Sequence, residues 1–217
     1  MGVIYISILL GGFAQDNVGA LLATDNVSSS LMQNNGFSVS ASGILISNPY
    51  GGIVFVAEPR FAVRLSSLSL SLGYLFSPSN LNGIPLSLSA SWVFRPLERF
   101  CVRPRVSVLG PSVFFPEDIY STYRLNLTGA AGVDAVYDPF KGAVVRPVGS
   151  LGATAGYAWG AIYSSATDHE EPLDGFGYAG SATLGLVYSA SRMSASLEAR
   201  ASYGGRFIPQ VTVSILW

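Results

Sequence analysis

The side chains that could perform acid–base or metal chemistry gather in one short acidic stretch. Asp168, His169, Glu170 and Glu171 are consecutive, and Asp174 follows three residues after Glu171. Carboxylates at this density could hold a divalent cation through their oxygen atoms. The stretch lacks the regular ligand spacing and the turn glycine of a calcium-binding loop, so a solvated extracellular loop is the simpler interpretation.

Nucleophilic catalysis would require His169 or Cys101 to work with a positioned partner. Each is the single residue of its type in the chain. Cys101 therefore cannot form an intramolecular disulfide, and a thiolate metal site is excluded. His169 beside Asp168 could act as a base, but no serine stands out as its nucleophile. The sequence predicts a protein that is not an enzyme and has no cofactor or metal site.

Arginines form the second group of residues with chemical potential. Five of them alternate with apolar residues close to short connections, namely Arg64, Arg95, Arg103, Arg105 and Arg146. A ring of guanidinium groups around a narrow aqueous path would attract anions. In the alternative interpretation these arginines form a structural network with Asp134, Glu198 and backbone carbonyl groups. The sequence leaves both interpretations open.

The elements that carry these residues have the pattern of β-strands. Apolar and polar residues alternate with a period of two, and helical spacing fits none of the segments. Eight such segments follow residue 61, and two shorter ones precede it at residues 37–46 and 53–57. A closed bacterial barrel has an even strand count, so ten strands are favoured and eight are the alternative. The stretch from Glu58 to Arg60 is similar to other short-turn sequences of the chain and predicts a turn near Glu58.

The two faces of the expected strands differ in chemistry. One face is apolar, with aromatic residues at the strand ends and Leu, Val, Ala and Gly in the middle, and the other carries Ser, Thr, Gly and charges. Two aromatic belts around an aliphatic band match the two headgroup layers of a membrane. No run of apolar residues is long enough for a transmembrane helix. We therefore expect an all-β fold, a closed antiparallel up-and-down transmembrane β-barrel.

The final eleven residues, Phe207 to Trp217, have apolar residues at every second position and end on an aromatic residue. Val213, Ile215 and Trp217 supply the last three of these positions. This stretch resembles the closing strand of bacterial outer-membrane β-barrels, in the size class of the OmpA transmembrane domain, OmpX and OmpW. The resemblance implies an outer membrane of the Gram-negative type, contact with its lipid, and recognition of the last strand by the barrel-assembly machinery. It leaves the exact family and the oligomeric state open.

Composition divides the chain into three parts. Residues 1–14 are predicted to be a signal peptide with a truncated start, residues 15–36 a polar amino-terminal segment, and residues 37–217 the barrel. A net charge of −1 and a single lysine argue against a nucleic-acid partner. The predicted function is a narrow, porin-like pore for small solutes, anionic ones among them. The alternative is a non-conducting structural or adhesin barrel that acts through its extracellular loops.

Overall fold

The computed structural model describes most of the barrel wall and one short segment inside it. The described residues are 27–31, 36–47, 53–65, 68–74, 86–110, 121–164, 169–172, 174–191, 193–204 and 207–217. The helix in this part of the chain is α2, a single turn at Val27–Ser30. No helix among the described residues is long and apolar enough to span a membrane.

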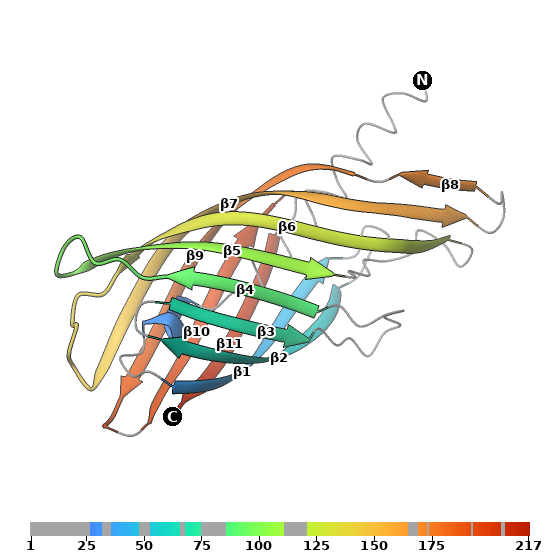
Figure 1. The fold of residues 1–217 in the computed structure, drawn as a ribbon. Helices are drawn as coiled ribbons and strands as arrows, with labels where there is room; N and C mark the ends of the chain where they lie inside the picture. Colours follow the sequence, from blue (N-terminus) through green and yellow to red (C-terminus); the bar gives the residue numbers. More distant parts are fainter. Residues whose placement is uncertain are drawn as a thin grey trace.

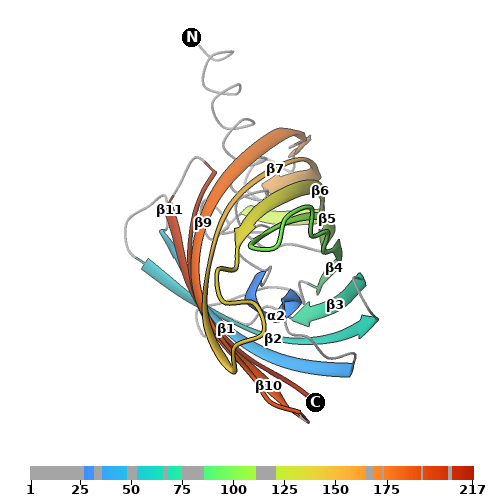
Figure 2. The same ribbon diagram turned by 90° about the vertical axis from the view of Figure 1, so that its left-hand side faces the viewer.

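Strands account for nearly all of the described residues. In chain order they are β1 (Gly36–Ser47), β2 (Ile53–Leu65), β3 (Leu68–Tyr74), β4 (Leu86–Trp92), β5 (Phe100–Gly110), β6 (Ser121–Tyr137), β7 (Val145–Ser164), β8 (His169–Pro172), β9 (Gly175–Ser189), β10 (Ser194–Tyr203) and β11 (Phe207–Leu216). Ten of them form the barrel wall, and β8 lies outside that circuit as an extension on β7. The wall curves around α2 (Figures 1 and 2).

The barrel closes where the first and last strands meet. β11 pairs antiparallel with β1 from Ser38↔Leu216 to Ile44↔Gln210, and it pairs with β10 on its other side. The backbone groups of Phe37 and Trp217 exchange two hydrogen bonds of 3.1 and 3.2 Å at the end of this ladder. Every neighbouring pair in the wall is antiparallel, so the predicted closed up-and-down barrel of ten strands is confirmed.

The predicted turn near Glu58 is wrong. Residues 53–65 form one continuous strand, β2, which pairs with β1 along its full length. The turn was predicted because Glu58-Pro59-Arg60 is similar to the short-turn sequences around Pro96 and Pro139, but a proline also fits a strand where no partner requires its N–H. Among the described residues β2 pairs with β3 only from Arg60 onward, so Pro59 lies just outside that ladder. The correction places Glu58 and Arg60 in mid-strand, with both side chains buried inside the barrel.

The outer surface of the barrel is apolar and exposed. Its middle carries aliphatic side chains that are about half or more exposed, among them Leu72, Leu88, Leu184 and Val213. The aromatic residues lie toward the strand ends: Phe61, Phe94, Tyr137, Tyr188 and Trp217 near the short turns, and Trp159, Phe176, Tyr178, Tyr203 and Phe207 near the long connections. A continuous apolar surface that surrounds the whole barrel is typical of a protein whose outer face contacts lipid hydrocarbon. The wall is that of a transmembrane barrel.

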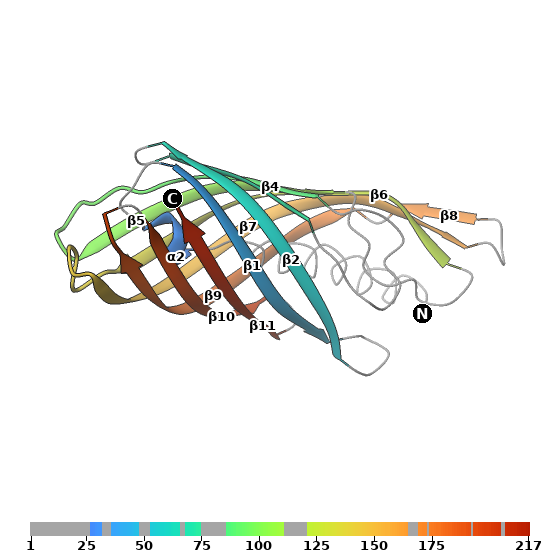
Figure 3. The ribbon, with the colours of Figure 1, turned by 90° about the horizontal axis from the view of Figure 1, so that it is seen from below.

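Two strands continue beyond the rim at the long-connection end. β7 pairs with β9 as far as Ala158, and beyond that point it pairs with β8 between residues 161 and 164. The first residues of β6 flank the same part of β7 on its other side. The result is a small three-stranded sheet that projects past the rest of the wall (Figures 1 and 3).

Candidate functional site: the charged barrel interior

The inward-facing positions carry hydroxyl groups, glycines and paired charges. In β10, for example, Ser194, Ser196, Glu198, Arg200 and Ser202 all point inward and are buried, whereas Leu197 and Ala199 face outward. This follows from the two-residue period of a strand, which turns every second side chain toward the interior. The charges in the described part of the interior form four groups, which lie on different parts of the wall.

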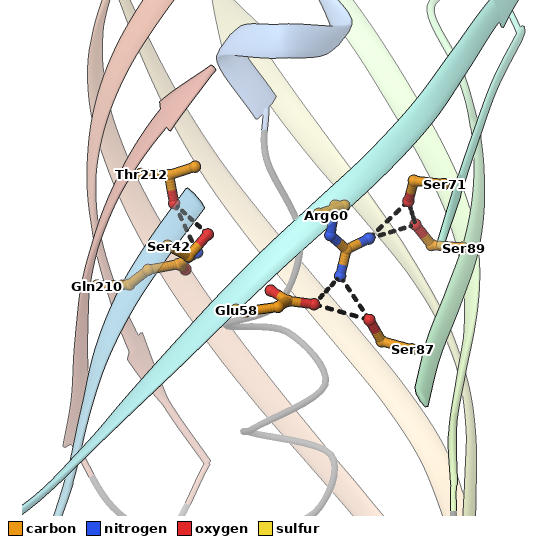
Figure 4. Close-up of polar contacts among 8 residues, drawn as sticks. All are labelled: Ser42, Glu58, Arg60, Ser71, Ser87, Ser89, Gln210 and Thr212. Atoms are coloured by element: carbon orange, nitrogen blue, oxygen red, sulfur yellow. Dashed lines mark hydrogen bonds and ion pairs between the residues drawn. The ribbon is translucent and has the colours of Figure 1, made fainter. Parts of the chain in front are cut away.

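The first group joins β2, β3 and β4 (Figure 4). Arg60 Nη2 lies 2.6 Å from Glu58 Oε1, and Arg60 also donates to the hydroxyl oxygens of Ser71, Ser87 and Ser89 at 2.5–3.1 Å. Ser87 in turn donates to Glu58 Oε1 at 2.7 Å. A Cβ atom at Gly73 would overlap the carboxylate, so glycine is needed there to admit it. Sequence analysis missed this group because it placed Glu58 in a turn.

The second group joins β5, β6 and β7 around one carboxylate. Asp134 Oδ2 lies 2.7 Å from Arg103 Nη1 and 3.3 Å from Arg105 Nε, and all three side chains are almost fully buried. Arg105 also donates to Thr154 Oγ1. Gly152 leaves room for the carboxylate, because a Cβ atom there would overlap Asp134 Oδ1. One carboxylate therefore serves two almost fully buried guanidinium groups.

The third group lies at the short-turn end of the barrel. Asp138 Oδ2 is 2.9 Å from Arg146 Nη1 and 3.4 Å from Arg95 Nη1. Arg95 is a quarter exposed, whereas Asp138 and Arg146 are fully buried. Arg64 lies close enough to Arg95 and Arg146 for their charges to act on it. Sequence analysis named only Asp134 and Glu198 as interior carboxylates and did not include Asp138.

The fourth group is on β10. Arg200 Nε lies 3.5 Å from Glu198 Oε1 and donates to Thr183 Oγ1 on β9 at 3.0 Å. The second carboxylate oxygen of Glu198 accepts a hydrogen bond from the backbone N–H of Ser28 at 2.7 Å. Glu198 thus binds both its own strand and the internal segment that contains α2.

The balance of charge inside the described part of the barrel is positive. Seven guanidinium groups (Arg60, Arg64, Arg95, Arg103, Arg105, Arg146 and Arg200) face four carboxylates (Glu58, Asp134, Asp138 and Glu198), which leaves a surplus of three. Four of the five arginines that sequence analysis singled out lie in ion pairs with Asp134 or Asp138. Pairing weakens the field of each arginine but does not cancel the surplus.

Interior hydroxyl groups fall into two classes. Ser42 and Thr212 are hydrogen-bonded at 2.8 Å across the β1–β11 seam, and Gln210 Nε2 donates to the same threonine at 2.8 Å (Figure 4). Further buried hydroxyls have no hydrogen-bond partner within the part of the chain that the structure describes, among them those of Ser107, Thr128, Ser150, Ser181, Ser196 and Ser202. These six lie on consecutive wall strands from β5 to β10.

The acidic stretch lies away from the barrel interior. His169, Glu170 and Glu171 are part of β8, for which only the backbone is described, and Asp168 lies outside the described residues. Asp174 is exposed and accepts a hydrogen bond of 2.7 Å from the Tyr157 hydroxyl. Among the described residues no group of three or more His, Cys, Asp and Glu side chains is arranged to hold a metal ion.

No protein-family model and no curated protein sequence matches this chain. Among solved structures, Neisserial surface protein A is 12% identical, with a TM-score of 0.38 over 82% of this chain and 93% of that one. Ail, the attachment invasion locus protein of Yersinia pestis, is 12% identical, with a TM-score of 0.40 over 84% and 98%. The KdgM porin is 11% identical, with a TM-score of 0.42 over 83% and 98%. All three TM-scores are below 0.5, so the barrel fold of this chain rests on its own strand pairing.

Proposed function

We propose that the protein is a narrow pore of a bacterial outer membrane that admits small, preferably anionic, solutes. In this orientation the short turns face the periplasm and the projecting β6–β7–β8 sheet faces the outside, as is usual for bacterial barrels. The observation that carries the proposal is the row of six buried interior hydroxyls without a partner among the described residues.

A packed structural interior would satisfy nearly all of its buried polar groups. The unsatisfied hydroxyls on β5 to β10 instead offer donors and acceptors that suit water or a polar solute in transit. The surplus of three guanidinium groups adds a positive potential along the same interior. In a narrow pore such a potential raises the local concentration of anions and excludes cations.

The selectivity test uses Arg95, the partly exposed arginine at the short-turn mouth. We expect wild-type channels in planar bilayers to prefer chloride over potassium, and Arg95→Gln to reduce the permeability ratio. One charge about 8 Å from the ion path attracts an anion and repels a cation by about 0.5 kcal/mol each in water, so the chloride-to-potassium ratio should fall about fivefold. Lys141→Gln removes the same charge from the exposed turn after β6 and should leave the ratio unchanged.

Cation preference in the wild type would contradict the proposed selectivity. Barrels that never conduct at any applied voltage, in the wild type or in the variants described below, would contradict the pore itself. They would favour the second candidate, an adhesin that acts through its outer end. The three-stranded projection formed by β6, β7 and β8 supports that alternative, because it lies beyond the rim and its β8 sequence is acidic. Loss of binding to host cells or matrix on replacing Glu170 and Glu171 by Gln would support it.

Recognition of the last strand by the assembly machinery is part of the same proposal. Trp217 closes the β1–β11 ladder through its backbone groups, while its indole is more than half exposed on the outer face. Trp217→Ser should therefore refold in detergent as well as the wild type but insert severalfold less in cells. Trp159→Ser, which removes an exposed indole at the opposite rim, should affect cell insertion little. Equal insertion of the two variants would argue against a signal in Trp217.

A further inference from the structure

The five residues Val27–Leu31, here called the plug segment, lie inside the barrel at its short-turn end. They comprise α2 and the following residue, and Figures 2 and 3 show α2 within the ring of strands. The backbone N–H of Leu31 donates to the Ser28 carbonyl at 3.1 Å, which closes the turn. Val27 and Leu31 are 1% and 0% exposed, so the segment is enclosed by the wall.

The wall presents a cluster of apolar side chains to the plug segment, unlike the rest of the interior. Val27 and Leu31 pack in one cluster with inward-facing residues from the short-turn ends of five strands: Cys101, Val136, Val148, Val187 and Leu216. The lumen of a transmembrane barrel is normally polar because it faces water or charged side chains. An apolar ring at the mouth is explained if a protein segment, rather than water, occupies it.

Two polar bonds fix the segment at its two ends. The backbone N–H of Ser28, one of the unpaired donors at the start of α2, donates to Glu198 Oε2 at 2.7 Å. Arg146 Nη2 donates to the Leu31 carbonyl oxygen at 2.5 Å. Both wall residues also hold a second partner, Arg200 for Glu198 and Asp138 for Arg146. The wall charges therefore remain paired if the segment leaves.

The wall also has a recess of matching shape. Gly185 on β9 faces inward, and a Cβ atom at this position would overlap Ser28 Oγ and lie 3.2 Å from Val148 Cγ2. Glycine is thus the residue that allows α2 to approach β9. The apolar cluster, the two end bonds and the recess involve residues of β5, β6, β7, β9, β10 and β11. All of them contact the plug segment.

We infer that Val27–Leu31 is an autoinhibitory plug that closes the short-turn mouth at rest, and that its displacement opens the pore. The inference rests on the proposed pore function. The plug blocks the path by filling the short-turn mouth with the buried side chains of Val27 and Leu31, and the second partners of Glu198 and Arg146 make its release reversible. Open and closed states then differ in the position of the plug, while the barrel wall is the same in both.

The test expels the plug while Glu198 and Arg146, the wall residues that bind it, stay unchanged. Gly185→Val places a side chain where Ser28 lies, and Ser28→Pro removes the N–H that binds Glu198 while remaining compatible with the first turn of a helix. Gly180→Val is the matched control: it is on the same strand, it faces outward, and the nearest atom to its Cβ would be 3.8 Å away. All three are made in the full chain, and heat-modifiable migration on gels shows that each barrel has folded.

Cys101 reports on the plug independently of conductance, because it is 1% exposed within the plug cluster. We expect a water-soluble maleimide to label folded Gly185→Val and Ser28→Pro at least tenfold faster than the wild type or Gly180→Val. Channel open probability in planar bilayers should rise in the same two variants.

Unchanged labelling in Gly185→Val and Ser28→Pro would overturn the plug. Faster labelling with equal conductance in all four proteins would overturn its gating role and leave the pore standing, whereas faster labelling with no conductance anywhere would overturn the pore.

Discussion

The barrel with Asp134→Ala is expected to lose about 3–5 kcal/mol of its free energy of unfolding. Asp134 is fully buried, and its carboxylate is the group shared by Arg103 and Arg105. Alanine would leave two almost fully buried guanidinium groups without this carboxylate, and a buried charge that loses its partner is destabilising. Urea unfolding in detergent, followed by the heat-modifiable gel shift, measures the loss.

Two controls separate the lost charge from the lost side chain. Asp134→Asn keeps an oxygen acceptor for the arginines and should give an intermediate loss. Asp174→Ala removes an exposed carboxylate that accepts a hydrogen bond from the Tyr157 hydroxyl, and it should change stability by about 0.5 kcal/mol or less. A loss for Asp134→Ala as small as that for Asp174→Ala would show that the arginines are adequately solvated without their carboxylate.

Insertion of Leu184→Arg into lipid is expected to cost about 2–4 kcal/mol. Leu184 lies near the middle of β9, faces outward and is 74% exposed. At this depth a guanidinium group either loses its hydration in the hydrocarbon or distorts the bilayer around it, and both cost free energy. The equilibrium between unfolded chain and lipid-inserted barrel, measured by tryptophan fluorescence in vesicles over a denaturant series, gives the cost.

Phe176→Arg is the depth control for this experiment. Phe176 lies on the same strand and the same face, but at the long-connection end, where it is 65% exposed. An arginine near the headgroup layer should cost only about 0–1 kcal/mol. Leu184→Ala controls for loss of the side chain alone. Equal costs for the two arginine variants would mean that β9 does not cross the membrane as its outer face indicates.

The amino-acid sequence by itself determined the barrel and its two faces. Alternation is a local property, since each strand residue points opposite to its neighbours whatever the rest of the fold does. The apolar positions therefore predicted the outer face directly, and the aromatic residues at strand ends predicted the membrane. The count of ten strands rested on the alternating segments, the need for an even total and the turn predicted near Glu58. The count is right although that turn is absent, because residues 37–46 and 53–57 lie in separate strands, β1 and β2. The structure confirms the closed barrel.

Tertiary structure decided the continuity of β2 and the partners of the interior charges. Pro59 between two charged residues is typical of a turn, and only the limits of the β3 ladder show that a strand can pass through it. Ion pairs join residues from separate strands, as when Asp134 on β6 meets Arg103 on β5. Which carboxylate serves which arginine depends on strand register and on glycines such as Gly152 that admit the side chain. The local periodicity of the sequence predicts neither the continuity of β2 nor the partners of the interior charges.

The plug segment shows the same limit most clearly. Val27–Leu31 lies in a stretch whose composition indicates only a polar amino-terminal segment, and five residues contain too little pattern to predict a binding partner. The wall residues that contact the plug segment come from the ends of five strands, together with Glu198, Arg146 and Gly185. These residues are far apart in sequence and become neighbours only when the barrel closes. The sequence determines which residues lie on each face of a strand, because that depends only on neighbouring positions. Whether a segment can close the mouth depends on residues from the whole wall.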